Sequence, residues 1–162
     1  MSVGAIILGW WARELGDRQS AAARGLAARL RRAGPVDALA ERAVHDLAQA
    51  LNLRDGARLA FLVRLLAEVR EHEGRPLARA LGGAEPVMSE LRFQRLMRAD
   101  GGELPEALRR AITLADRSCN VARLGSDLLH WGEDVRRRWC FDYYGVDAPQ
   151  AATPSVSEEI SE

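Results

Sequence analysis

The stretch SELRFQRLMRAD, residues 89–100, carries the pattern from which the fold can be inferred. On a helical wheel its apolar side chains fall within an arc of about 100°: Phe93, Leu96 and Met97. Three arginines share the other side of the wheel: Arg92, Arg95 and Arg98. Ser89 is a favourable residue at the start of a helix. The stretch is therefore predicted to be an amphipathic helix that packs one face on a core.

The same spacing of apolar residues recurs along nearly the whole chain. Leu59, Leu62 and Leu66, for example, form a stripe in the middle of the sequence. No segment alternates apolar and polar residues as a strand would. Helices are predicted over residues 3–15, 17–35, 36–51, 54–74, 75–83, 89–98, 103–116 and 118–144, the last being the longest. The predicted fold is all-α, a single compact bundle of seven or eight helices.

Length and composition favour one soluble domain. A chain of 162 residues with 48% hydrophobic and 28% charged residues can build one sizeable core. Residues 1–147 are predicted to form the helical domain, and residues 148–162, with little to bury, a disordered acidic tail. The apolar run near the N-terminus is about half the roughly 20 residues of a membrane span. With no export signal and no cysteine framework, we expect a cytoplasmic protein with no membrane partner.

All of the positive charge is carried by arginine. The 23 basic residues include no lysine, and 23 acidic residues bring the formal net charge to zero. Residues 148–162 contain three glutamates and no arginine, so the preceding part has 23 basic against 20 acidic residues, a net charge of +3. Each guanidinium is a planar fork suited to phosphate or carboxylate. The excess is small, so a binding face has to arise from how the charges are arranged.

Signatures of catalysis and metal binding are missing. The sequence has no glycine-rich phosphate loop and no Cys-x-x-Cys motif, and its three histidines have no metal-ligand spacing. Asp127, Glu133 and Asp134 are more simply explained as partners of nearby arginines than as catalytic carboxylates. We therefore predict that the protein is not an enzyme and that it needs no cofactor and no metal.

The arginines leave two interpretations open. They can be the solvated sides of core helices, with salt bridges to neighbouring carboxylates and, for the run 136–138, a cation–π contact to Trp139 or Tyr143. They can also form a surface that follows a phosphate backbone, which needs charge and reach but no base-edge geometry. Leu91 lies beside the arginines of the opening stretch, which predicts that a neighbour covers part of that face. In the run Arg136-Arg137-Arg138, at least one side chain must lie near the apolar seam.

Three blocks of the sequence resemble one protein family. SELRFQRLMRAD, the later NVARLGSDLLHWGEDVRRRWCFDYY (residues 120–144), and Trp10-Trp11 followed by GDRQSAAARGLAARLRR occur in matching order over about residues 8–145. They are similar to the small-subunit (CasB) family of the type I-E CRISPR surveillance complex, Cascade.

The resemblance implies an all-α, non-catalytic subunit of an RNA-guided antiviral complex. Such a subunit contacts the backbone of crRNA and target DNA and helps to hold the displaced strand, while base pairing reads the sequence. Other Cascade subunits and a second copy of the chain are the implied protein partners. The alternative is a purely structural adaptor whose arginines pair with acidic partner surfaces. The family-like positions for nucleic-acid contact are Arg18, Arg31, Arg32, Arg92, Arg95, Arg98, Arg136, Arg137 and Arg138. Those assigned to the core are Trp10, Phe93, Leu96, Trp131, Trp139 and Tyr143.

Overall fold

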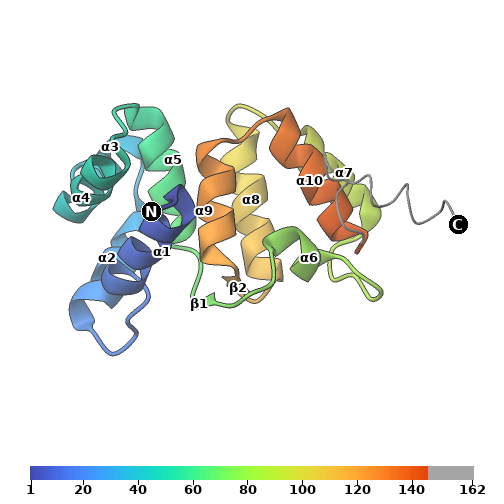
Figure 1. Ribbon diagram of the computed structural model, residues 1–162, viewed down its shortest axis with the longest axis horizontal. Coiled ribbons are helices and arrows are strands. Elements are labelled where there is room, and N and C mark those ends of the chain that lie inside the picture. Colours follow the sequence, from blue (N-terminus) through green and yellow to red (C-terminus); the bar gives the residue numbers. More distant parts are fainter. Residues whose placement is uncertain (146–162) are drawn as a thin grey trace, which may run out of the picture.

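The structure, a computed structural model, describes residues 1–145 and is almost entirely helical (Figure 1). The predicted all-α class is confirmed. Eight helices of the described part have nine to twelve residues, and two have five. The helices are α1 (Val3–Glu14), α2 (Ala21–Arg32), α3 (Pro35–Leu39), α4 (Arg42–Leu51), α5 (Gly56–Leu66), α6 (Leu77–Leu81), α7 (Glu90–Arg98), α8 (Glu103–Leu114), α9 (Val121–Leu129) and α10 (Glu133–Tyr143). The predicted acidic tail lies outside the described residues.

Helix α9 joins two groups of helices. Helices α1 to α5 lie on one side of it in Figure 1, and α6, α7, α8 and α10 lie on the other. Helix α1 packs closely on α9 because Gly125 presents no side chain to it. A Cβ atom at Gly125 would lie 2.5 Å from Cγ2 of Ile7, which real contacts do not allow. This close approach ties the N-terminal helices to the half of the molecule that carries the opening stretch.

The predicted helix over residues 118–144 is wrong as a single element. It is broken at residues 130–132 into α9 and α10, and Gly132 takes an extended backbone with φ of 176°. Glu133 and Asp134 then open α10, where carboxylates interact favourably with the positive end of the helix dipole. The continuous apolar spacing was misleading because both helices turn their stripes toward the same core.

Two other predicted helices also differ from those in the structure. The segment 36–51 is divided into α3 and α4, and the segment 54–74 is helical only as far as Leu66. Beyond it, β1 (Glu71–His72) pairs in parallel with β2 (Ser118–Cys119). The sequence predicted no strand, since two residues are too few to show alternation. The pair fixes the turn after α5 against the turn after α8.

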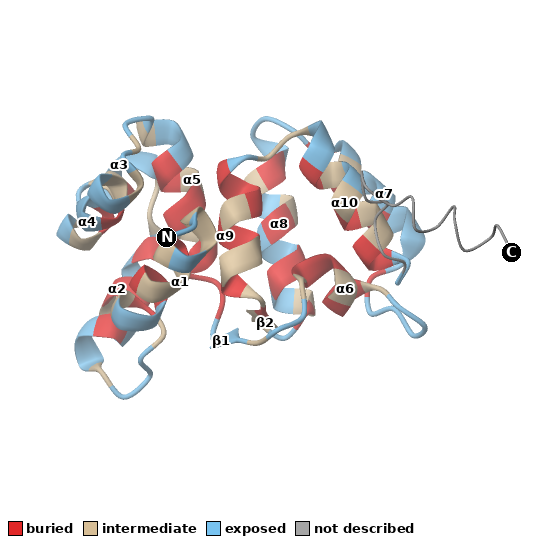
Figure 2. Cartoon of the chain, in the orientation of Figure 1, coloured by how far each residue is buried: buried red, intermediate tan, exposed pale blue. Residues whose placement is uncertain are grey.

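The core contains most of the predicted structural residues (Figure 2). Five are buried, with exposures of 3% or less: Trp10, Phe93, Leu96, Trp139 and Tyr143. Trp131 is only partly buried and meets the Trp139 ring edge-on, with the centroids 5.0 Å apart.

Within residues 1–145, no helix has the length and hydrophobicity that crossing a bilayer requires.

Candidate nucleic-acid interface

An open groove of about 1210 Å³ runs between α7 and α8. Apolar residues contribute to its lining, among them Leu96, Ala99 and Leu114. Six arginines line it: Arg92, Arg95, Arg98, Arg109, Arg110 and Arg117. Four carboxylates accompany them: Glu68, Glu103, Glu106 and Asp116. The groove therefore combines an apolar lining with an excess of positive charge.

Helix α7 forms one wall of the groove, and its three arginines have no carboxylate partner among residues 1–145. The Ser89 hydroxyl accepts a hydrogen bond from the Arg92 backbone N–H at 3.2 Å and caps the helix. The buried ring of Phe93 stacks on Tyr143, with centroids 4.1 Å apart, and fixes the rotation of the helix. Arg92, Arg95 and Arg98 are consequently exposed, and no ion pair joins any of them to a carboxylate of residues 1–145.

Leu91 lies on this face too and is 54% exposed. The prediction that a neighbour covers it is wrong for the described part of the chain. The helical wheel placed Leu91 correctly beside the arginines, but the side chain points to solvent together with them.

Helix α8 forms the other wall, where arginines and carboxylates are paired. Glu106 lies 2.8 Å from Arg109 and 3.7 Å from Arg110. Glu68, at the inner end of the groove, is only 3% exposed and lies 3.7 Å from Arg109 and 3.6 Å from Arg117. The free positive charge of the groove thus lies mainly on the α7 side.

Arg31 and Arg32 end helix α2, and Arg31 lines a small cavity together with Glu68 and Arg109 of the groove. The Arg31 guanidinium is half-buried and donates to the Ala67 carbonyl at 3.5 Å. Burial lowers the pKa of Arg31, the charge of Glu68 opposes that effect, and the nearby Arg117 adds to it. Arg32 is exposed. Folding thus brings Arg31 from the first sequence block close to a carboxylate of the groove.

The three arginines of α10 are held by partners within the chain. Arg136 donates to the Ala99 carbonyl at 3.3 Å, and its guanidinium carbon lies 5.8 Å from the centre of the Trp131 ring. Arg137 pairs with Glu133 at 3.2 Å and with Asp134 at 2.9 Å, and Arg138 pairs with Asp127 at 2.9 Å. The predicted pairing of these acids with neighbouring arginines is confirmed. The predicted cation–π contact to Trp139 or Tyr143 is wrong, because Arg136 lies over the Trp131 ring instead.

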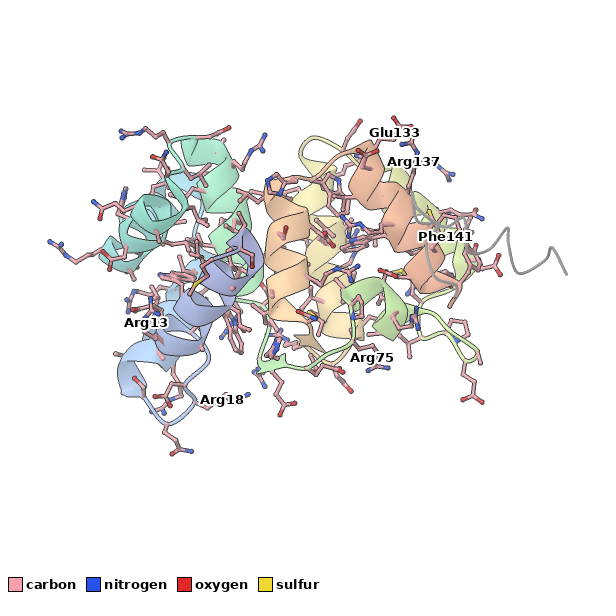
Figure 3. All side chains as sticks on the ribbon, in the orientation of Figure 1. Arg13, Arg18, Arg75, Glu133, Arg137 and Phe141 are labelled. Carbon is pink, nitrogen blue, oxygen red and sulfur yellow. The ribbon has the colours of Figure 1, made fainter. Side chains whose placement is uncertain are left out.

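Arg18 is distant from the α10 arginines. It lies exposed in the turn between α1 and α2, at the lower left of Figure 3, whereas Arg137 lies at the upper right. The nine sequence-predicted arginines therefore do not form one continuous surface. The α7 row lines the groove, Arg31 lies near Glu68 of the same groove, and Arg18 lies apart from both.

Comparison with known proteins identifies the family. The sequence profile described as CRISPR-associated protein Cse2 matches residues 26–144, well over half of the chain. The chain belongs to the Cse2 family.

A Cse2 protein of Thermus thermophilus is 36% identical over 100 residues, which cover 56% of this chain and 58% of that relative. The sequence match thus spans somewhat more than half of the length of this curated relative. The crystal structure of CasB from Thermus thermophilus has a TM-score of 0.72 and 30% identity, and covers 90% of this chain and all of that one. A chain in the crystal structure of E. coli Cascade bound to a PAM-containing dsDNA target has a TM-score of 0.58 and 24% identity, and covers 86% of this chain and 91% of that one.

The Cse2 match includes most of the predicted site. It begins at residue 26 and so contains Arg31, Arg32 and the arginines of α7 and α10, but not Arg18. The sequence-predicted site included no residue of α8 or of the turn that follows it, and so missed Arg109, Arg110 and Arg117, which line the groove. The adjacent Arg109-Arg110 pair was a usable signal. Arg117 offered none, because it reaches the groove through a turn with left-handed backbone.

Within residues 1–145 no three His, Cys, Asp or Glu residues are grouped as metal ligands.

Proposed function

We propose that this Cse2-family protein is a non-catalytic subunit of a CRISPR RNA-guided antiviral complex, Cascade. In that role it contacts the backbone of crRNA and target DNA and stabilises the displaced strand of the R-loop. Other Cascade subunits and a second copy of the chain are its proposed partners. Membership of the Cse2 family and a fold shared with a chain of E. coli Cascade bound to dsDNA support the assembly. The observation that carries nucleic-acid binding is the row of arginines on α7 that have no ion-pair partner in the described part of the chain.

The geometry of that row suits a phosphate backbone. At about 1.5 Å of rise per residue, the row from Arg92 to Arg98 extends about 9 Å along the helix axis. One strand of a nucleic acid presents a phosphate about every 3.4 Å of helix rise. The row therefore spans two or three successive phosphates. Such contacts position the strand without reading its bases, as expected of a subunit in a complex in which pairing with the guide reads the sequence.

The remaining predicted arginines rank below the α7 row as proposed contacts. Arg31 lines the small cavity that adjoins the groove at Glu68, Arg32 is exposed, and Arg18 is exposed in the turn between α1 and α2 (Figure 3). The α10 arginines would have to exchange partners within the chain for phosphates. Direct contact by Arg136, Arg137 and Arg138 stays a prediction that needs its own variants.

The test is the salt dependence of binding to single-stranded DNA of mixed sequence. The test variant carries Arg92→Ala, Arg95→Ala and Arg98→Ala. A matched control removes three exposed arginines that also have no ion-pair partner in residues 1–145: Arg13, Arg42 and Arg54. Each lost phosphate contact lowers the slope of log affinity against log salt by about 0.7. We expect the α7 variant to lose about 2 from the slope and the control to lose much less, although both lose the same charge.

Two results would argue against the proposal. Equal losses in the two variants would mean that only net charge matters and that the groove is not the binding surface. An unchanged slope in the α7 variant, together with failure to assemble with other Cascade subunits, would favour the structural adaptor instead.

A further inference from the structure

A single buried carboxylate lies among arginines from three separate segments. Glu68 follows α5 and is 3% exposed. Arg109 of α8 and Arg117 of the turn after α8 pair with it, and Arg31 of α2 is close enough for their charges to interact. Glu68 also lines a smaller adjoining cavity together with Arg31, so it stands where the groove meets that cavity.

Arg117 reaches this position through an unfavourable backbone. Asp116 and Arg117 have φ of 61° and 56°, two successive left-handed residues of which neither is glycine. Such residues are disfavoured and persist only where surrounding contacts hold them. Here the Arg117 carbonyl accepts hydrogen bonds from the backbone N–H groups of Arg70 at 2.7 Å and Glu71 at 3.1 Å. The fold thus maintains an unfavourable turn whose side chain lines the groove.

The donors of Arg117 remain free to bind a ligand. Its nearest carboxylate oxygen, on Glu68, is 3.6 Å away, which is beyond good hydrogen-bonding distance. No hydrogen bond of the Arg117 guanidinium is present within residues 1–145. Arg109, by contrast, donates to Glu106 at 2.8 Å. Glu68 therefore attracts Arg117 without using its donors.

Stability alone does not account for Glu68. Burial raises the pKa of its carboxyl above the ordinary value, although Arg117 and Arg109 act to lower it. The folded state consequently disfavours the ionised carboxylate relative to the unfolded chain. The site also contains more positive charge than its carboxylates balance, since three guanidinium groups accompany Glu68 and Glu106, the partner of Arg109.

We propose that Glu68 is a positioning residue, which holds Arg31, Arg109 and Arg117 as a preformed clamp for one phosphate group at the inner end of the groove. With Glu68 and Glu106 ionised, three positive and two negative charges leave a net charge of +1 at the clamp, which matches the single negative charge of a backbone phosphate. The role of the clamp rests on the proposed nucleic-acid binding. In that function its ligand is a backbone phosphate next to those that the α7 arginines contact. The clamp itself is a site for an oxyanion and can be tested without nucleic acid.

The experiment titrates the full chain with inorganic phosphate and follows the arginine Nε–Hε signals by NMR. The central variant is Glu68→Gln, which keeps the shape of the side chain and makes the protein more positive by one charge. If Glu68 only offsets charge, this variant binds phosphate more tightly than the unmodified chain. If Glu68 positions the clamp, the variant binds more weakly, by about tenfold, because the three cations repel one another and spread.

Two further variants and a stability measurement complete the design. Arg117→Asn removes the guanidinium but tolerates the left-handed backbone, and it should abolish the saturable shift. The α7 triple variant should retain it, because those arginines are outside the clamp. Urea unfolding should show Glu68→Gln to be about as stable as the unmodified chain, so that weaker binding is not a folding defect.

The outcomes separate the clamp from the proposed function. Phosphate binding that is lost in Arg117→Asn and weakened in Glu68→Gln supports the clamp. If binding to single-stranded DNA then shows no dependence on salt, the proposed function fails and the clamp stands. Tighter binding by Glu68→Gln, or no saturable shift in the unmodified chain, overturns the clamp whatever the DNA measurement shows.

Discussion

Helices α7 and α10 each present three arginines, but only one of the two sets is free. On α7 the guanidinium groups of Arg92, Arg95 and Arg98 have no carboxylate partner within residues 1–145 and line a groove. On α10 every one of the three is engaged, by carboxylates, by a backbone carbonyl or by an aromatic ring. Equal counts of arginine therefore provide unequal amounts of available charge.

The difference comes from where the acidic residues lie. Glu133 and Asp134 precede Arg137 by four and three positions, which places all three on one side of α10. On α7 the position four before Arg95 is Leu91, and the position four before Arg98 is Gln94. An arginine row with no carboxylate at these spacings is the feature to look for when searching a sequence for a phosphate-binding surface.

The largest effect that would sharpen this comparison is expected from Arg138→Ala. Asp127 is buried and accepts from Arg138 at 2.9 Å and from the Trp139 indole N–H at 2.8 Å. Removing Arg138 leaves a buried carboxylate without its counter-charge. Loss of one partner from a fully buried ion pair lowers the free energy of unfolding by roughly 3–5 kcal/mol. Because Arg138 is partly exposed, we expect a smaller loss in the free energy of unfolding, about 2 kcal/mol, measured by urea denaturation.

The control is Arg92→Ala, which removes an exposed arginine without an ion-pair partner from α7. It should change the free energy of unfolding by less than about 0.5 kcal/mol. If the two variants are equally stable, the division into a structural α10 set and an available α7 set is wrong.

Sequence alone was sufficient for the fold class and for the arginine row of α7, since both depend on spacing within one helix. The pairing of Arg137 was also accessible, because its partners are three and four residues away. Asp127 was also predicted to pair with a nearby arginine, but its contact with Arg138 crosses a break at residues 130–132 that the apolar periodicity concealed. The groove depends on contacts between helices, and Arg117 enters it through a left-handed turn, so neither could be predicted from local pattern.

A carboxylate added to α7 should give one of its arginines an ion-pair partner on the same helix, as Arg137 has on α10. Leu91 is exposed and lies four residues before Arg95, so Leu91→Glu places an acid at a favourable pairing distance. We expect affinity for single-stranded DNA to fall about threefold, with the salt slope reduced by about 0.7, one phosphate contact. Helix stability should rise by about 0.3 kcal/mol from the new pair.

Two matched variants isolate the pairing effect. Leu91→Gln has the same size as Leu91→Glu without its charge, and it should bind like the unmodified chain. Val36→Glu adds the same charge at an exposed position on α3, and its effect should be small. A loss of affinity in Val36→Glu as large as in Leu91→Glu would mean that net charge, and not a partner on α7, controls binding.

The smallest effect is expected from Arg137→Ala, on the same helix as Arg138. The side chain of Arg137 is 64% exposed and its partners Glu133 and Asp134 are more exposed still, so solvent screens the pairs. Exposed pairs of this kind contribute about 0–1 kcal/mol, and we expect the free energy of unfolding to fall by no more than about 0.5 kcal/mol. The salt slope of DNA binding should also stay unchanged, because two carboxylates already balance this cation. A slope lowered by about 0.7 would show instead that Arg137 leaves its partners for a phosphate, and pairing within the chain would then no longer separate available arginines from structural ones.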